Sequence, residues 1–232
     1  MRDWREHWRG IAPETSATTD DCLRQVGKTV LGEPVHSNHI ATILATVAEQ
    51  LSLVPLDVVV DLGCGNGLLT ARIADQVSRV VGIDVSDSLI KTARSVNARS
   101  NCSYHTGDLA ALGELPLTNV SKAYSYEVFQ HLSGDEVRSL LSFLLSRFDE
   151  GLLFFAGSIP DRLLLHSFYD TPARWSQYQQ RHANGTEQIG HWWERGELND
   201  VCSDLGLKCT PTDQAPTLYT SHYRFDAKIE AQ

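Results

Sequence analysis

The spacing of apolar residues changes at about residue 37, and this change marks where a folded core is expected to begin. From there the apolar residues recur at helical spacing, at Ile40, Ile43, Leu44, Val47 and Leu51. This periodicity predicts an amphipathic helix that ends before Pro55 and packs one face against a sheet. Residues 4–33 are more polar, so we expect a lead-in with a short helix at 21–26 and no strand of the main sheet.

After this helix, short apolar runs alternate with helical stretches. The runs predicted as strands are residues 58–60, 80–83, 102–105, 123–126 and 152–156. The stretches predicted as helices are residues 68–77, 87–98 and 135–147, the last opened by a capping box of Ser133 and Glu136. This alternation favours a parallel sheet covered by helices on both faces.

The alternation weakens after residue 157. Residues 158–196 are rich in aromatic and polar side chains, and we expect an insert there that caps the carboxyl ends of the strands. A helix at 197–205 and two strands at 207–212 and 222–229 follow, and the short loop between these strands predicts an antiparallel hairpin. The predicted fold class is therefore α/β, with a doubly wound, mostly parallel, seven-stranded sheet and a C-terminal antiparallel hairpin edge.

Length and composition fit one domain of this kind. The chain has 232 residues, of which 42% are hydrophobic, and we expect residues 37–232 to form the domain and residues 1–36 a lead-in or cap. The apolar runs are too short to span a membrane, and the charged, tryptophan-containing start does not fit a signal peptide. These features predict a cytoplasmic protein, a monomer or homodimer, that does not bind membranes.

Charge and cysteine usage exclude further classes of partner. The 20 Lys and Arg residues stand against 29 Asp and Glu, and the resulting net charge of −9 argues against a nucleic-acid partner. The five cysteines are scattered, with no pair at the two-residue separation of metal sites. We therefore expect reduced thiols and no metal site.

A glycine-rich turn follows the first predicted strand and precedes the next helix. Its sequence is Asp61-Leu62-Gly63-Cys64-Gly65-Asn66-Gly67. Glycines allow a tight bend and a close approach to a ligand, and a helix N-terminus presents unpaired N–H groups. The spacing is G-x-G-x-G, whereas dinucleotide-binding turns favour G-x-G-x-x-G, whose third glycine is replaced here by Leu68.

This turn resembles the first motif of class I S-adenosylmethionine (SAM)-dependent methyltransferases. Three later stretches resemble the same family, namely Gly82-Ile83-Asp84-Val85, Gly107-Asp108-Leu109 and Ser125-Tyr126-Glu127-Val128-Phe129-Gln130-His131-Leu132. The last resembles the small-molecule branch, in particular ubiquinone-biosynthesis-like and sugar methyltransferases. The resemblance covers about residues 37–157 well and the closing strands loosely, and it implies a Rossmann-like methyltransferase fold with SAM as the cofactor.

The resemblance also implies roles for the matching residues. Those expected at the cofactor are Asp61, Gly63, Cys64, Gly65, Gly67, Asp84, Val85, Asp108, Leu109, Tyr126 and Glu127. The three glycines would curve around the methionine part, with Asp61 near its ammonium group. Asp84, expected at a solvent-facing strand end, can accept hydrogen bonds from both ribose hydroxyls. Asp108 and Leu109 would contact adenine, while Tyr126 and Glu127 would lie beside the methyl donor.

Methyl transfer mainly requires alignment, because the sulfonium donor is already activated. A hydroxyl acceptor is helped by a base, and a histidine suits that role. His131 is the first candidate and His191 the second, with His191-Trp192-Trp193 expected to face the acceptor from the insert. The alternative for His131 is a helix-capping role without chemistry. The alternative for Trp192 and Trp193 is that one or both indoles pack in the core.

The predicted function is methyl transfer to a small-molecule acceptor, a polar metabolite such as a sugar, at oxygen or nitrogen. Two alternatives stay open. A nicotinamide-dependent oxidoreductase shares the turn and the ribose acid, although the glycine spacing and the lack of a Tyr-x-x-x-Lys pair disfavour it. A noncatalytic cofactor-binding protein could use the same fold.

Overall fold

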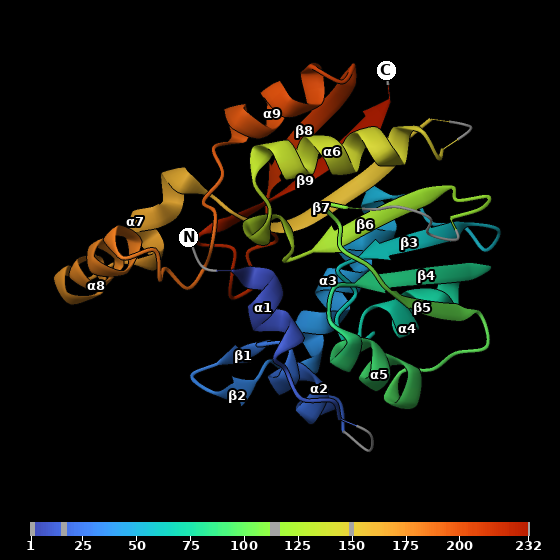
Figure 1. The fold of residues 1–232 in the computed structure, drawn as a ribbon, viewed down its shortest axis with the longest axis horizontal. Helices are drawn as coiled ribbons and strands as arrows, with labels where there is room; N and C mark the ends of the chain where they lie inside the picture. Colours follow the sequence, from blue (N-terminus) through green and yellow to red (C-terminus); the bar gives the residue numbers. More distant parts are fainter. Residues whose placement is uncertain (1–2, 15–17, 112–116, 149–150, 232) are drawn as a thin grey trace.

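The computed structural model describes residues 3–14, 18–111, 117–148 and 151–231. One sheet of seven strands, in the order β5-β4-β3-β6-β7-β9-β8, forms its centre (Figure 1). The strands are β3 (Val58–Leu62), β4 (Arg79–Asp84), β5 (Cys102–Thr106), β6 (Lys122–Tyr126), β7 (Leu153–Pro160), β8 (Leu207–Asp213) and β9 (Arg224–Ala231). The first five pair in parallel, and β9 is antiparallel to both β7 and β8. The predicted sheet and its hairpin edge are confirmed.

Helices cover both faces of the sheet. They are α3 (Ser37–Gln50), α4 (Thr70–Ile73), α5 (Asp87–Val96), α6 (Gly134–Leu145) and α9 (Arg195–Ser203). Successive side chains of a strand point to opposite faces, so Val59 packs in the cluster that includes α3 and α4, while Val60 packs in the cluster that includes α6 and α9. Strands buried on both faces explain the unbroken apolar runs in the sequence.

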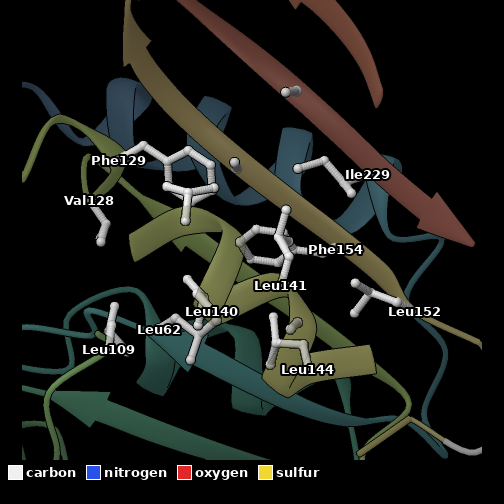
Figure 2. Packing of buried hydrophobic residues seen from close by; sticks show 14 of the residues in the cluster. Leu62, Leu109, Val128, Phe129, Leu140, Leu141, Leu144, Leu152, Phe154 and Ile229 are labelled. Atoms are coloured by element: carbon white, nitrogen blue, oxygen red, sulfur yellow. The ribbon is translucent and has the colours of Figure 1, made fainter. Parts of the chain in front are cut away.

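The face covered by α6 and α9 holds the larger apolar cluster. Leu140, Leu141 and Leu144 of α6 are fully buried in it with Leu62 and Phe154 of the sheet (Figure 2). Burial of each leucine stabilises the fold by about 1.5–3 kcal/mol relative to an exposed side chain. The cluster therefore holds β3 and β7 firmly in the sheet whose carboxyl edge carries the candidate site.

The predicted helices at 37–51, 87–98 and 135–147 agree with α3, α5 and α6, and the capping box of Ser133 and Glu136 is present. The stretch 68–77 is less regular than predicted, because α4 is short and a 3₁₀ turn, Ala74–Gln76, follows it. Val77 already has extended backbone and leads into β4, which leaves few residues for a helix.

The lead-in before the sheet differs from expectation. The lead-in forms α1 (Trp4–Arg9), α2 (Thr19–Gln25) and the strand pair β1 (Thr29–Val30) and β2 (Glu33–Pro34), so it is more structured than one short helix. Residues 1–2 and 15–17 of the predicted cap lie outside the described residues. In Figure 1, α1 lies at the left edge of the sheet, the side on which α7 and α8 project.

The insert is shorter than predicted and the closing hairpin loop is longer. β7 continues to Pro160, so the insert, with α7 (Leu165–Phe168) and α8 (Pro172–Ala183), begins after that residue. Residues 214–223, rather than a short loop, join β8 to β9. Within the described residues, no helix has both the length and the apolar character needed to cross a membrane.

Candidate functional site

A cavity of about 520 Å³ lies at the carboxyl ends of β3, β4 and β6. This is the switch point of the sheet, since β4 lies on one side of β3 and β6 lies on the other. We call the residues at the strand ends the floor; they fall within 61–69, 84–89, 108–109 and 126–132. We call the residues from elsewhere the roof; they fall within 4–8, 26–29, 168, 188–189 and 219–224.

The glycine-rich turn contributes two of its three glycines to the cavity wall. Gly63 and Gly65 line the cavity with φ angles of +77° and +55°, which glycine adopts without strain. Gly67 is not among the described lining residues, contrary to the prediction. A Cβ at Gly67 would lie 2.8 Å from the hydroxyl of Tyr104 and 3.0 Å from Cβ of Ala93. Position 67 therefore requires glycine, because a larger side chain would clash where the turn packs against β5 and α5.

Asp61 lies beneath this turn and is almost fully buried. One of its carboxylate oxygens, Oδ2, accepts hydrogen bonds from Thr70 Oγ1 and from the Tyr124 hydroxyl, each at 2.6 Å. Burial raises the pKa of Asp61 to about 6, although both hydrogen bonds oppose the shift. The carboxylate is therefore charged at neutral pH and can pair with a cation in the cavity.

Asp84 is buried, which corrects the prediction of a solvent-facing strand end. Its Oδ2 accepts from the backbone N–H of Gly65 and its Oδ1 from that of Ser86, each at 2.9 Å. Burial raises the pKa of Asp84, and these hydrogen bonds act against it. Each carboxylate oxygen has a second lone pair, so Asp84 can hold the turn and still accept hydrogen bonds from a ligand.

Asp108 is joined to the lead-in by an ion pair. Its Oδ2 lies 2.7 Å from Arg5 Nε, and its Oδ1 accepts from the backbone N–H of Ala110 at 3.0 Å. The same guanidinium donates to Glu136, the capping-box residue of α6. Arg5 thereby fastens α1 over the part of the floor that Leu109 also lines.

Tyr126 and Glu127 line the cavity where β6 ends. Glu127 has a left-handed backbone, with φ of +61°, and its Oε2 lies 2.8 Å from Nζ of the buried Lys28. Burial acts to raise the pKa of Glu127, but Lys28 and Arg224 outweigh it and the pKa is lowered. Lys28 Nζ also lies 4.8 Å from the centre of the Tyr126 ring. This ion pair is a second link between roof and floor.

His131 lines the cavity between floor and roof. Its ring centre lies 4.5 Å from that of Trp4 and 5.6 Å from that of Trp8, both on α1. Gln130 Oε1 accepts a hydrogen bond from Arg224, so the amide nitrogen of Gln130 faces His131 Nε2, at 3.3 Å. We infer from this pairing that Nε2 is the acceptor and that the neutral ring carries its proton on Nδ1.

His191 is not among the described residues that line the cavity, contrary to the prediction. Its Nε2 lies 3.2 Å from both carboxylate oxygens of Glu197, the first-turn acid of α9. Its backbone N–H donates to the carbonyl of Gln130 at 2.8 Å. His191 thus holds the loop that carries His131 through its backbone, while its ring points to α9.

The two tryptophans beside His191 are packed rather than facing an acceptor. Trp193 is fully buried, and its Nε1 donates to the carbonyl of Phe129 at 2.9 Å. Trp192 lies in a separate apolar cluster of the insert. The insert reaches the cavity instead through Phe168, Gln188 and Ile189.

Several roof residues have no counterpart in the sequence prediction. They are Trp4, Arg5, Trp8, Lys28, Tyr219 and Arg224. A signal existed for the tryptophans, because Trp4 and Trp8 are four residues apart and so share one face of a helix. The described residues contain no group of three or more His, Cys, Asp or Glu side chains that could hold a metal ion.

Comparison with known proteins relates part of this site to a described family. Residues 59–148 match the family model described as a methyltransferase domain. These residues are thus similar in sequence to a methyltransferase domain. That domain contains β3, β4, β5 and β6, and therefore most of the floor. The match confirms the resemblance that the motifs indicated.

Curated relatives match the methyltransferase domain over short stretches. An uncharacterized methyltransferase of Schizosaccharomyces pombe is 36% identical over 61 residues, which are 26% of this chain and 24% of that protein. Magnesium-protoporphyrin O-methyltransferase of Rhodobacter capsulatus is 40% identical over 76 residues, which are 29% of this chain and 34% of that protein. The chain therefore spans only about a quarter and a third of these relatives.

Solved structures extend the likeness to the whole fold. Magnesium protoporphyrin IX methyltransferase of Synechocystis has a TM-score of 0.60 at 20% identity, covering 98% of this chain and 94% of that one. A SAM-dependent methyltransferase of Aquifex aeolicus has a TM-score of 0.60 at 15% identity, covering 85% and 94%. Identities this low show the fold alone, and that fold is the predicted Rossmann-like methyltransferase fold.

Proposed function

We propose that this protein transfers the methyl group of SAM to a small polar metabolite, at an oxygen or nitrogen atom. The observation that carries the proposal is one cavity in which the glycine turn, Asp84 and Asp108 lie on the same floor as His131. The methyltransferase-domain match supports the reaction class, and the Synechocystis relative, whose structure has S-adenosylhomocysteine (SAH) bound, supports the cofactor.

The floor suits the chemistry of SAM part by part. We assign the charged Asp61 carboxylate, beside Gly63 and Gly65, to the ammonium group, which needs a buried negative partner. Asp84 is assigned to the ribose hydroxyls through its remaining lone pairs. Asp108 is assigned to the adenine amino group.

The remaining cofactor residues are assigned by their places along the floor. Leu109 and Val85 would contact adenosine, Cys64 would lie at the turn, and Tyr126 and Glu127 would lie beside the methyl donor. Gly67 supports this arrangement only through packing of the turn.

SAM supplies an activated methyl group, so this chain's residues have mainly to align the acceptor and exclude water. We propose that His131 Nε2 takes up the proton of the hydroxyl group that receives the methyl group. In the structure that atom faces the Gln130 amide at 3.3 Å, a long and weak contact that an acceptor hydroxyl can replace. We also propose that residues 1–36 act as a cap on the domain formed by residues 37–232, because α1 contributes Trp4 and Trp8 to the roof.

Calorimetry with SAH tests the cofactor assignment. Asp84→Ala removes charge-assisted hydrogen bonds worth roughly 1.5–3 kcal/mol each and should weaken SAH binding at least about tenfold. Since Asp84 also holds Gly65, part of the loss comes from the turn. The control is Asp75→Ala, an exposed acid outside the cavity, which should bind SAH like the wild type. Unchanged affinity in Asp84→Ala contradicts the assignment.

Labelled SAM incubated with metabolite extracts tests the reaction itself. Transfer of label to a metabolite is the expected result. SAH binding without transfer to any metabolite would favour a noncatalytic cofactor-binding protein. Binding of a nicotinamide dinucleotide in place of SAH would favour an oxidoreductase.

A further inference from the structure

Arg224 is a buried cation at the roof of the cavity that has only neutral hydrogen-bond partners among the described residues. Its side chain comes from the start of β9, and the residue is 5% exposed. One guanidinium nitrogen, Nη1, donates to the carbonyl of Ser158 at 2.6 Å and to Gln130 Oε1. Its Nε is buried and has no hydrogen-bond partner in the described part of the chain. Buried arginines ordinarily pair with a carboxylate, because an uncompensated charge away from water is costly.

None of the carboxylates around Arg224 forms an ion pair with it in the described part of the chain. Glu127 pairs directly with Lys28 at 2.8 Å, and the charge of Arg224 acts on Glu127 only without direct contact. Asp226, two residues along β9, accepts instead from the backbone N–H of Ser158 at 2.8 Å and from Gln214 Nε2 at 3.0 Å. Burial raises the pKa of Asp226, and both of these hydrogen bonds act against the shift. Arg224 therefore lines the cavity with no carboxylate in direct contact among the described residues.

The backbone of β7 is shaped to hold Arg224 in place. The register between β7 and β9 shifts between Ala156 and Ile159, and Ser158 in this bulge has a φ of +62°. A serine in the left-handed region is uncommon and persists only where its surroundings require it. Here its carbonyl accepts from Arg224 while its N–H donates to Asp226. The backbone of Ser158 thus bonds both side chains and fixes the position of Arg224 at the cavity wall.

The cavity wall near Arg224 is aromatic. The Tyr223 ring centre lies 5.0 Å from the guanidinium carbon, and Phe168 and Tyr219 line the same roof. Gln130 contacts both Arg224 and His131, so the cation lies one amide group away from the candidate proton acceptor. A ligand held here would be flat and apolar in its body, with a negative group at one end.

We propose that Arg224 binds a carboxylate of the methyl acceptor, and that the acceptor is therefore an aromatic organic acid rather than an uncharged sugar. This inference rests on the proposed function, since it names the substrate class of the same site. A guanidinium presents paired N–H donors that match a carboxylate. A singly charged carboxylate matches one guanidinium better than a phosphate, which carries up to two negative charges near neutral pH.

A matched pair of probes tests the proposal on the protein saturated with SAH. Naphthalene-2-carboxylate and naphthalene-2-carboxamide share a ring and differ in charge, and their binding is measured by calorimetry. We expect the carboxylate to bind the wild type at least about tenfold more tightly, because charge-assisted hydrogen bonds are the stronger class. Arg224→Gln should remove this preference while SAH affinity stays within about twofold. Arg138→Gln is the matched control, since Arg138 pairs with Asp204 outside the cavity, and it should keep the preference.

The outcomes separate this inference from the proposed function. A wild type that binds SAH but binds the two probes equally, or binds neither, overturns the carboxylate subsite alone. A wild type that does not bind SAH overturns the proposed function first. The wild-type comparison does not depend on how Arg224→Gln folds. Arg224→Lys, which keeps the charge but loses the paired donors, should retain part of the preference, and a full loss of binding to both probes in that variant would contradict a charge-based contact.

Discussion

The floor of the cavity is made of backbone turns at the ends of parallel strands, whereas the roof is made of side chains from segments far apart in the chain. Gly63 and Gly65 shape the floor through their φ angles, and Asp84 holds the turn through a backbone N–H. The roof depends on contacts such as that between Lys28 and Glu127, which are 99 positions apart. On the proposed function, the residues assigned to the cofactor lie in the floor, whereas those assigned to the acceptor are His131 and residues of the roof.

Floor and roof meet at few charged contacts. Arg5 bonds Asp108 at one end of the cavity, and Lys28 bonds Glu127 at the other. A substitution in the part of the floor assigned to the cofactor should therefore abolish cofactor binding. A substitution of His131 or in the roof should change acceptor turnover or cofactor release. The predictions below test this division, from the largest expected effect to the smallest.

Gly65→Val should remove detectable SAH binding, with a loss of more than about 100-fold. The φ of +55° is a conformation that a β-branched residue rarely adopts, and a Cβ there would lie 3.2 Å from Val26 Cγ1. Calorimetry gives the affinity, and a thermal melt reports whether the fold survives. Gly196→Ala is the control, because a Cβ at Gly196 meets nothing within 4 Å. An unaltered binding isotherm for Gly65→Val would remove the turn from the cofactor site.

His131→Ala should lower kcat by roughly 10²–10⁴-fold for a hydroxyl acceptor, while SAH affinity changes less than about twofold. The acidic limb of the pH–rate profile should also disappear, because that limb reports protonation of the imidazole. His166→Ala is the control, since that exposed ring stacks on Trp175 away from the cavity. Turnover near the wild-type rate would reject His131 as the base and mean that catalysis comes from alignment of the methyl donor and its acceptor. A parallel loss of SAH binding would mean that His131 shapes the donor site.

Asp61 should make both stability and cofactor binding depend on pH. Because burial raises its pKa from 3.8 to about 6, the folded state binds the proton more tightly than the unfolded state does. The free energy of unfolding of the ligand-free protein should therefore fall by up to roughly 3 kcal/mol between about pH 4 and pH 6 and then level off.

Asp61→Asn isolates this effect. The free energy of unfolding of the variant, measured by chemical denaturation, should not fall between about pH 4 and pH 6. In the wild type, SAH affinity should rise by up to about tenfold from pH 5 to pH 7 as the carboxylate becomes charged, and in the variant it should stay flat. A wild-type affinity independent of pH over this range would separate Asp61 from the ammonium group.

What could be predicted from the sequence follows the same division. The turn and Asp84 could be found because strand ends are local features, set by the residues directly before and after them. For Gly67 nothing in the sequence indicated the packing reason for glycine, because the close neighbour Tyr104 lies on another strand. Lys28 and Arg224 carried no signal, because a single basic residue in a turn or strand is ordinarily exposed and only the folded chain brings it to Glu127 or Gln130.

Arg5→Gln should give the smallest effect, because partly exposed ion pairs contribute about 1 kcal/mol or less each. The Arg5 side chain is 34% exposed and holds α1 to Asp108 and Glu136. Its loss should weaken SAH binding about fivefold, mainly through faster dissociation as α1 detaches from the floor, while the melting temperature changes little. Stopped-flow release of SAH measures the rate. Arg9→Gln removes the same charge from an exposed position of the same helix and should leave the release rate unchanged. If both variants release SAH at the wild-type rate, α1 covers the acceptor end only and the Arg5 contact serves stability rather than cofactor retention.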